Sequence, residues 1–265
     1  MLKHVLKCGI QGLGYELARR RAPDLPFVHH LECDGERLRF WIVSEHTRSW
    51  WAHPSLSLDA ELRFFRTHCM AGGTVLEIGA HHGLHTLLMS RWVGPTGAVH
   101  AFEANPDNAL VLCANIGLNR LTWCEAVAAA AAASTRPIKL AGETVNTAGG
   151  GGGGDALSVD DYLRRAGLAG VDLLKVDVEG FEAHVLAGAS ELLRHRPAID
   201  LELHLDDLAR YGTSVEDVLR LLAWEEYDVE AMARPDWQTV TRVTGAQDLP
   251  AAGVVDLFFH PKRRQ

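Results

Sequence analysis

From residue 73 onward, short apolar runs alternate along the chain with longer segments that carry apolar residues at helical spacing. The short runs are typical of buried strands, and the longer segments are typical of amphipathic helices. Alternating strands and helices predict an α/β fold with a mostly parallel sheet. The predicted strands span residues 74–78, 98–102, 121–127, 171–176, 198–204, 227–232 and 254–260, and the predicted helices span 84–92, 106–116, 181–195 and 215–224.

The last two predicted strands are joined by a turn-rich segment without a helical pattern. Parallel strands need a long crossover, usually a helix, so these two strands are expected to form an antiparallel pair at one edge of the sheet. The pattern therefore predicts seven strands, mostly parallel with one reversed, with helices on both faces.

Residues 1–56 are predicted to form an N-terminal extension, and residues 57–265 the main domain. In the extension, apolar residues between positions 2 and 17 fall on one helical stripe, and residues 38–43 are predicted to form a strand. The N-terminal helix is too short and too interrupted by charge for a signal peptide. It is expected to pack on the domain, with binding to a membrane surface or a partner as the alternative. A helix over residues 57–67 would open the main domain.

Two segments have low complexity. Residues 128–133 are six alanines, which are interpreted as neutral filler or the start of a short helix. Residues 149–154 are six glycines, and glycine weakens both helices and strands. The glycine run is therefore predicted to be a mobile surface loop, with a lid over a substrate pocket as the alternative.

Composition and charge narrow the classes of function. The 265 residues carry a net charge of −8, which argues against binding nucleic acid through bulk positive charge. No segment approaches the roughly 20 apolar residues that a membrane-spanning helix needs. The five cysteines include no pair with CxxC spacing, so neither a zinc site nor a disulfide framework is indicated, and a reducing cytoplasm is expected.

Candidate chemistry begins at the end of the first strand of the main domain. Glu77 is followed there by Gly79, Ala80 and His81, and Gly83 precedes the next helix. Ligands of open α/β sheets bind at the carboxyl ends of strands, where glycines allow a tight turn and a close approach of the backbone. The spacing is neither the GxGxxG fingerprint nor a P-loop, and Glu77 would repel a pyrophosphate. The loop therefore suits a cationic or zwitterionic ligand.

The next strand also ends in a carboxylate, Glu103, which can accept hydrogen bonds from both hydroxyls of a ribose. Two strand-end acids with a glycine turn between them, and no phosphate-binding device, indicate a nucleoside that lacks phosphates. S-adenosylmethionine, which carries an amino acid and a sulfonium, fits this description.

Five segments in this order resemble the FkbM family of S-adenosylmethionine-dependent methyltransferases: "VLEIGAHHGLHT", "VHAFEANP", "LSVDDYL", "VDLLKVDVEGFEAHVLAGA" and "AIDLELH". The resemblance covers about residues 57–260 and is most specific around residues 175–189. It implies the Rossmann-like class I methyltransferase fold. It also implies methyl transfer, usually to a hydroxyl oxygen on a sugar, lipid or polyketide-like acceptor.

The resemblance further implies cofactor-binding positions, with the methionine side at the loop after Glu77, the ribose at Glu103, and the adenine edge at Glu125 and Ala126. Glu77 and His81 depart from the family pattern, which usually has Asp and Asn at these places, although the longer acid at Glu77 can still reach an amine. The predicted cofactor set is Glu77, Gly79, Ala80, His81, Gly83, Thr86, Glu103, Ala104, Asn105, Glu125, Ala126 and Asp177.

A second polar group ends the fourth and fifth strands of the main domain. Lys175, Asp177 and Glu179 alternate along the chain and are expected to point to one side, as are Glu202 and His204 on the neighbouring strand. The acids and His204 are therefore predicted to surround the methyl acceptor. A structural ion pair between Lys175 and one acid is the alternative.

His204 is the predicted general base, because an imidazole with an ordinary pKa near ~6.5 is neutral enough to take a hydroxyl proton. Mg²⁺ held by Asp177 and Glu202 is the alternative, although no metal is expected. His81 and His85 are four residues apart and would share one face of a helix, but contacts near the cofactor or solvent exposure are expected there instead.

The sequence thus predicts an S-adenosylmethionine-dependent methyltransferase of the cytoplasm that methylates a hydroxyl of a small-molecule, sugar or lipid acceptor. Methylation of nitrogen and a non-catalytic nucleoside-binding subunit are the alternatives. A homodimer is left open, and neither nucleic acid nor stable membrane insertion is expected. Acceptor specificity is expected in the extension and in residues 135–154 and 224–250. Trp50, Trp51 and Trp237 would form an aromatic wall or pack in the core.

Overall fold

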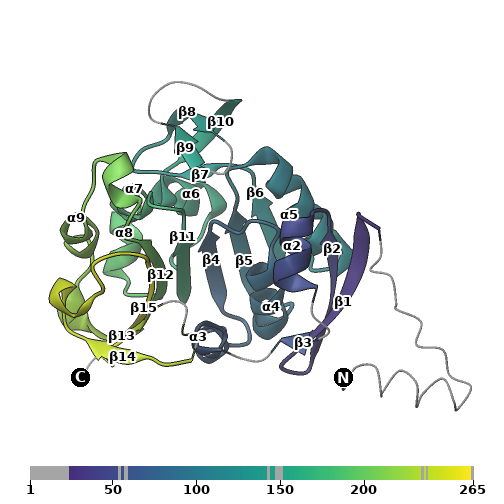
Figure 1. Cartoon of the computed structure of the whole chain (residues 1–265), viewed down its shortest axis with the longest axis horizontal. Helices are drawn as coiled ribbons and strands as arrows, with labels where there is room; N and C mark the ends of the chain where they lie inside the picture. The colour runs from purple at the N-terminus through teal and green to yellow at the C-terminus, as the bar shows by residue number, and fades with distance from the viewer. Residues whose placement is uncertain are drawn as a thin grey trace, which may run out of the picture.

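The computed structural model describes residues 24–52, 55–56, 59–141, 144–146, 152–233, 236 and 238–263. The predicted N-terminal helix and Trp237 lie outside these residues. The described part forms a central eight-stranded sheet, a four-stranded sheet and a three-stranded sheet (Figure 1). None of its helices is long and apolar enough to cross a membrane.

The strands belong to the three sheets just named. They are β1 (Phe27–Cys33), β2 (Glu36–Ile42), β3 (Ser55–Leu56), β4 (Thr74–Ile78), β5 (Ala98–Phe102), β6 (Cys124–Val127), β7 (Ala130–Ala131), β8 (Arg136–Ala141), β9 (Thr144–Asn146), β10 (Gly152–Leu157), β11 (Leu173–Asp177), β12 (Ala198–His204), β13 (Tyr227–Ala233), β14 (Thr241–Val243) and β15 (Val254–Pro261). The helices are α2 (Glu45–Trp51), α3 (Ala60–His68), α4 (Leu84–Val93), α5 (Pro106–Leu118), α6 (Val159–Ala166), α7 (Glu182–Ala187), α8 (Ser190–Arg194) and α9 (Val215–Leu219). Short 3₁₀ turns are η1 (Leu208–Tyr211), η2 (Trp224–Glu226) and η3 (Ala246–Asp248).

The central sheet has the strand order β14-β13-β15-β12-β11-β4-β5-β6. Strands β6, β5, β4, β11 and β12 are parallel, and β15 lies antiparallel between β12 and β13. The predicted α/β fold and the predicted antiparallel pair at one edge are therefore confirmed. The sheet has one strand more than the seven predicted, because β14 is a three-residue edge strand whose first two residues are exposed, so it leaves little apolar signal.

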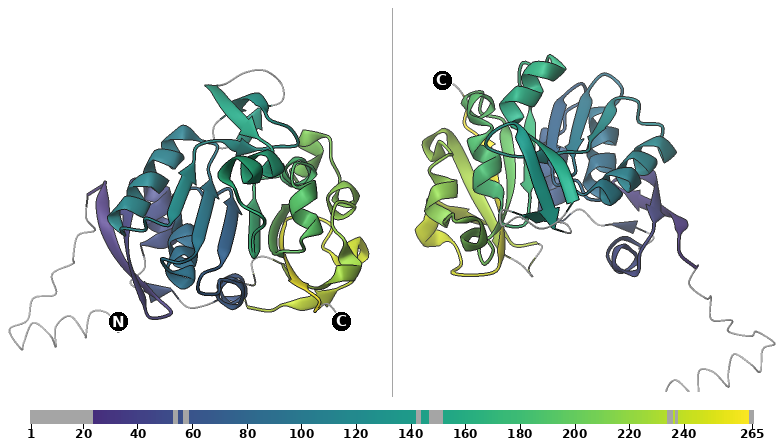
Figure 2. Two further views of the ribbon diagram at one scale, coloured as in Figure 1. Left: turned by 180° about the vertical axis from the view of Figure 1, so that it is seen from behind. Right: turned by 90° about the horizontal axis from the view of Figure 1, so that it is seen from above.

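Helices cover both faces of the sheet (Figure 2), and each face carries its own apolar core. Along β4 and β11, Leu76 and Leu174 belong to the core covered by α6, α7, α8 and α9. Val75 and Leu173, one residue earlier, belong to the core covered by α3, α4 and α5. This alternation follows from the period of two in a strand, and it places every second residue of β4 and β11 on the side of α3.

The N-terminal hairpin of β1 and β2 is attached to α5 through two asparagine side chains. The Asn119 amide accepts a hydrogen bond from the backbone N–H of Arg39 at 2.9 Å and donates one to the Arg39 carbonyl at 2.7 Å. One turn earlier, Asn115 accepts from the N–H of Trp41 at 2.7 Å and donates to the carbonyl of His82 at 2.8 Å. The asparagines thus satisfy backbone groups along one edge of β2 that no strand pairs.

The glycine run was predicted as a loop, and for Gly152–Gly154 this is wrong. These residues begin strand β10, which pairs antiparallel with β8 in the four-stranded sheet, while residues 149–151 lie outside the described part. A strand satisfies the backbone N–H and C=O groups whatever the side chain is. The pairing with residues 138–140 of β8 therefore offsets the entropy cost of the glycines.

The alanine run is neither filler nor a helix start. Residues 129–132 are buried, and β7 pairs with the end of β10. The strand predicted over residues 121–127 is also shorter, since β6 begins at Cys124.

Two predicted helices are interrupted. The helix expected over residues 181–195 is divided into α7 and α8 by Gly188 and Ala189. The carboxylate of Asp160 in α6 accepts hydrogen bonds from the N–H groups of Glu191 and Leu192, at 2.8 and 3.0 Å, so it caps the new helix start. The helix expected over residues 215–224 ends at Leu219, and a 3₁₀ turn follows at Trp224.

We predict that Asn119→Ala lowers the free energy of unfolding by about 1–3 kcal/mol, because it leaves both backbone groups of Arg39 without their partner. Urea denaturation of the variant and the parent would measure the loss. An unchanged midpoint with an unchanged slope would show that the hairpin does not depend on this side chain.

Candidate functional site

A cavity of about 650 Å³ opens at the carboxyl ends of β4, β5, β11 and β12. It lies where the strand order switches direction between β4 and β11, which is the usual ligand position in open α/β sheets. Most of the predicted site residues line it. They are Glu77, Gly79, Ala80, His81, Glu103, Ala104, Asp177, Glu179 and Glu202.

The loop after β4 is held close to both neighbouring strands. The N–H groups of Gly79 and Ala80 both donate to the carbonyl of Phe102, at 3.0 and 2.8 Å. Gly79 has a φ of +92°, and a Cβ there would lie 1.7 Å from the carbonyl oxygen of Asp177. Only glycine permits this approach, so the loop is fixed between the two strand ends that carry the site.

Glu77 is buried beneath this loop, with 1% of its surface exposed. The Thr86 hydroxyl donates to its carboxylate at 2.5 Å, so Thr86 supports Glu77 from α4 without lining the cavity itself. Burial raises the pKa of Glu77 to about 8, although the nearby charge of Lys175 works in the opposite direction. A cation bound next to this carboxylate would favour its ionised form.

Glu103 is fixed by two backbone donors. The N–H of His81 donates to one carboxylate oxygen at 2.7 Å, and the N–H of Asn105 donates to the other at 2.8 Å. The side chain of Asn105 in turn caps α5 and does not line the cavity. The carboxylate at the end of β5 is therefore held in one orientation in the wall of the cavity.

The structure places the adenine-edge candidates away from the cavity. The side chain of Glu125 is 63% exposed and lies 3.4 Å from the ring of His100, and neither it nor Ala126 lines the cavity. Residues 129–131, just beyond the end of β6, line the cavity in their place. The rule that ligands bind at the carboxyl ends of strands could have identified this segment.

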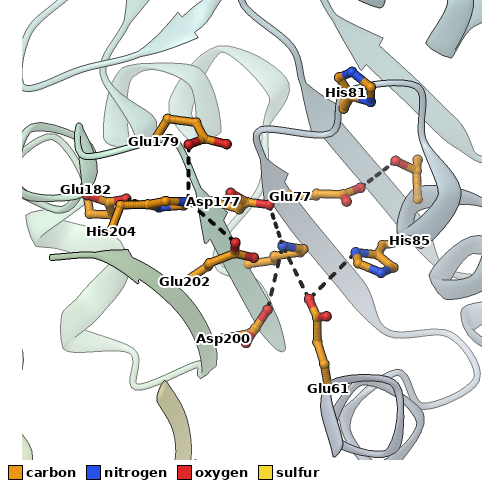
Figure 3. Close-up of polar contacts among 12 residues, drawn as sticks. Glu61, Glu77, His81, His85, Asp177, Glu179, Glu182, Asp200, Glu202 and His204 are labelled. Carbon is orange, nitrogen blue, oxygen red and sulfur yellow. Dashed lines mark hydrogen bonds and ion pairs between the residues drawn. The ribbon is translucent and has the colours of Figure 1, made fainter. Parts of the chain in front are cut away.

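A row of polar side chains crosses the face of the sheet that α3 covers. Lys175 is paired in register with Glu77 on one side and with Asp200 on the other. Its ammonium lies 3.4 Å from Asp177, 3.5 Å from Glu61 and 3.8 Å from Asp200. Figure 3 shows these carboxyl groups turned toward a common point. Burial alone would lower the pKa of Lys175, but the surrounding carboxylates keep it well above its ordinary value.

Glu61, from the first turn of α3, lines the cavity and was not identified from the sequence. Its carboxylate lies within 3.7 Å of the His85 ring as well as beside Lys175. An acid in the first turn of a helix is common for electrostatic reasons alone, so its position in the sequence did not distinguish it.

His204 is surrounded by carboxylates (Figure 3). Its Nδ1 lies 3.0 Å from Glu182, and its Nε2 lies 3.2 Å from Glu179 and 3.5 Å from Glu202. Glu179 reaches this position from a turn after β11, where its φ is +53°, and not as a continuation of the strand face. The ring itself does not line the cavity, whereas Glu179 and Glu202 do.

The expectation of an ordinary pKa at His204 is wrong. Burial alone would lower this pKa, but the hydrogen bond to Glu182 and the charges of Asp177, Glu179 and Glu202 raise it to about 9. The imidazole is therefore protonated at neutral pH in the unliganded protein.

Aromatic rings form one wall of the cavity. Trp50 and Trp51 of α2 both line it, with ring centroids 6.1 and 5.2 Å from that of His81. His81 precedes α4 and has a φ of +51°, so its spacing from His85 is not helical. Of the two alternatives left open by the sequence, Trp50 lies in the wall of the cavity, and Trp51 both lines the cavity and packs against the core at Phe40.

Strands β6-β5-β4-β11-β12-β15-β13, with β15 antiparallel between β12 and β13, have the seven-stranded order of the class I methyltransferases, and β14 adds an eighth strand at the edge. The sequence profile of the Methyltransferase FkbM domain matches residues 77–230. The chain therefore belongs to the FkbM methyltransferase family, a family of S-adenosylmethionine-dependent methyltransferases, as the sequence resemblance implied.

Three solved structures are similar to this chain. Methyltransferase FkbM from Methylobacillus flagellatus is 17% identical, with 71% of this chain and 43% of that chain covered and a TM-score of 0.47. An S-adenosylmethionine-dependent O-methyltransferase from Thermotoga maritima is 12% identical, with 88% and 77% covered and a TM-score of 0.45. Fibrillarin from Aeropyrum pernix, with S-adenosylmethionine bound, is 14% identical, with 91% and 85% covered and a TM-score of 0.44.

The chain spans less than half the length of the Methylobacillus protein. No curated protein matches the sequence.

We predict that the stability contributed by His204 declines between about pH 6.5 and pH 9. A pKa raised in the folded state stabilises the fold fully below the unfolded pKa of ~6.5, and this contribution is lost as the pH rises through the folded value of about 9. Urea denaturation across this range should show a steeper loss of stability for the parent than for His204→Gln. Parallel curves would contradict the raised pKa.

Proposed function

We propose that this chain transfers the methyl group of S-adenosylmethionine to a hydroxyl oxygen of a small-molecule, sugar or lipid acceptor bound in the cavity. One observation carries the proposal. A single cavity joins the carboxylates at the ends of β4 and β5 to a second group of carboxylates at the ends of β11 and β12. The first pair suits the methyl donor, and the second group suits the acceptor.

The residues around the first pair fit the cofactor. Glu103 would accept hydrogen bonds from the ribose hydroxyls, and Glu77 would face the cationic amino acid end. The glycine turn at Gly79 leaves room for close backbone approach, and Ala129 and Ala130 offer small apolar side chains where the adenine would lie. When bound, the cofactor supplies an electrophilic methyl group on a sulfonium.

Methyl transfer is a displacement that needs an aligned oxygen and an acceptor for its proton. With the cofactor bound, the bond from the methyl carbon to sulfur would break as the bond to the acceptor oxygen forms. The products are S-adenosylhomocysteine, the methyl ether and one proton. Glu179 is placed to take that proton, because it lines the cavity and lies 3.2 Å from the protonated ring of His204.

His204 was the predicted base, and its raised pKa changes how that role would work. The imidazolium must lose its own proton before it can accept another, so at neutral pH it would instead orient Glu179 and stabilise the charge of its carboxylate. Partial burial raises the pKa of Glu179 above its ordinary value, although the charge of His204 works in the opposite direction. A raised pKa brings the carboxylate closer to the strength of a useful base.

A divalent metal is the rival means of activating the hydroxyl. Asp177, Glu179 and His204 each offer a ligand atom, and these atoms lie within 4.8 Å of one another. The ammonium of Lys175, 3.4 Å from Asp177, would repel such an ion. We therefore favour activation without a metal.

We predict that Glu103→Ala weakens S-adenosylmethionine binding by roughly tenfold to a hundredfold, because it removes charge-assisted hydrogen bonds to the ribose. Titration calorimetry would measure the affinity, with the exposed Glu216→Ala as the control. An unchanged affinity would remove Glu103 from the cofactor site.

We predict that Glu179→Gln lowers turnover by roughly 10²–10⁴-fold with little change in cofactor affinity, because the variant cannot take the proton. The pH–rate profile separates the two candidate bases. Activity that is already maximal near neutral pH indicates Glu179, whereas activity that keeps rising toward pH 9 indicates His204 as the base.

Loss of the parent's activity on chelation, with recovery when Mg²⁺ is added, would replace the carboxylate base with a metal. Mass spectrometry of the product would show whether oxygen or nitrogen receives the methyl group.

A further inference from the structure

The walls of the cavity are strongly acidic. Among the described residues that line it, none is a lysine or an arginine. Seven carry carboxyl groups: Asp59, Glu61, Glu77, Glu103, Asp177, Glu179 and Glu202.

Cations behind the wall neutralise only part of this charge. Lys175 serves Glu61 and Asp177, but it also faces the buried Asp200. His204 serves Glu179 and Glu202, but its other nitrogen is bound to the buried Glu182. Each of these two cations thus faces three acids, of which two belong to the wall of the cavity. The two cations therefore cannot neutralise the wall, and the cavity remains negative.

The methyl donor would leave much of this charge in place. Its ammonium and sulfonium carry two positive charges and its carboxylate one negative charge, so it adds a single net charge beside Glu77 and Glu103. Asp59 and Glu61, at the start of α3, belong to neither the cofactor pair nor the strand-end group. The pKa of Asp59 is raised by burial and then by the charge of Glu61, so these two acids repel each other across the start of the helix.

Glu61 is in addition poorly satisfied. It is 3% exposed, and its Oε1 has no hydrogen-bond partner in the part of the chain that the structure describes. The ammonium of Lys175 and the ring of His85 are near that oxygen, at 3.5 and 3.7 Å, but beyond hydrogen-bonding distance. A buried carboxylate oxygen without a donor is costly, so a ligand that donates there would be bound strongly.

The indole of Trp50 provides a flat surface in the wall of the cavity, beside His81. Trp50 lines the cavity and is 51% exposed. The ring of His46 also packs against it, with 3.7 Å between the two ring centroids. An exposed indole binds the apolar face of a sugar ring and also attracts cations.

We propose that the methyl acceptor is a hydroxyl compound that also carries a protonated amine, such as an amino sugar or an amino alcohol. This proposal rests on the proposed function. In it, the ammonium group binds at Asp59 and Glu61, and the ring of the acceptor packs on Trp50. The ammonium has no lone pair, so the methyl group goes to a hydroxyl oxygen and the proton of that hydroxyl goes to Glu179.

A divalent cation is the other ligand that an acidic cavity could bind. The two carboxylate groups that could hold one, at Asp177 and at Asp200, both lie within 3.8 Å of the ammonium of Lys175. Asp59 belongs to neither group and forms no ion pair with Lys175 among the described residues, so an amine on the acceptor can bind there, with Glu61 adding its charge from the same helix start. The geometry therefore favours the organic cation.

Four sugars that share one ring test the proposal: glucosamine, N-acetylglucosamine, glucose and glucuronic acid. Binding of each to the full chain saturated with S-adenosylhomocysteine would be measured by NMR titration at about pH 6.5, where the amine of glucosamine is protonated. We expect glucosamine to bind at least roughly tenfold more tightly than glucose or N-acetylglucosamine, and glucuronic acid to bind most weakly.

Glu61→Gln should reduce the preference for glucosamine, and Asp59→Asn, which keeps a helix-capping side chain, should do the same. Trp50→Leu should weaken binding of all the sugars. The exposed Glu216→Gln is the matched control and should leave the preference unchanged.

The proposal is overturned if glucosamine has no advantage over glucose, including the case in which neither binds, or if the advantage survives in both acid variants. It is also overturned if chelation abolishes the advantage and Mg²⁺ restores it, because the acids would then hold a metal. Failure of S-adenosylhomocysteine itself to bind would contradict the proposed function, and is thereby distinguished from a failure of the amine preference alone.

Discussion

The buried ammonium of Lys175 is the interaction on which the rest of the site depends. An isolated charge in a protein interior costs several kcal/mol, so it persists only when opposite charges surround it. Asp177 provides such a charge from the sheet and Glu61 provides one from α3, and Asp200 lies 3.8 Å from the ammonium, although burial holds the pKa of Asp200 well above its ordinary value. The same ammonium lets these acids lie close together, since without it their mutual repulsion would separate them. A single lysine thus fixes both the floor of the cavity and the docking of the helix above it.

This arrangement also explains why the two faces of the sheet differ. The residues of β4, β11 and β12 that face α6, α7 and α8 are aliphatic, and they form an ordinary packed core. The residues that face α3 become polar toward the carboxyl ends of the strands, where the cavity opens. The apolar face therefore supplies most of the hydrophobic stabilisation, and the opposite face can carry charged groups whose burial would otherwise be too costly.

The sequence was sufficient for the elements whose physical signal is local. Apolar runs located the parallel strands, and strand-end position located Glu77, Glu103, Asp177 and Glu202, which line one cavity. The features it did not locate depend on contacts between distant segments. Gly152–Gly154 form a strand only because β8 lies beside them, and Glu61 is part of the cavity only because α3 crosses the sheet over Lys175. Of the four acids that raise the pKa of His204, strand-end position indicated Asp177, Glu179 and Glu202, but not Glu182 of α7, whose hydrogen bond to the ring raises this pKa most.

The side chain of Asn115 joins parts of the chain that a modular view would separate. Its oxygen accepts from the backbone of β2 in the N-terminal hairpin, and its nitrogen donates to His82 in the loop that follows β4. The hairpin leads directly into α2, whose tryptophans line the cavity. The N-terminal segment is therefore not an independent module that could be replaced by an unrelated one. Any replacement would have to present the same backbone edge to α5, or the loop after β4 would lose one of its anchors.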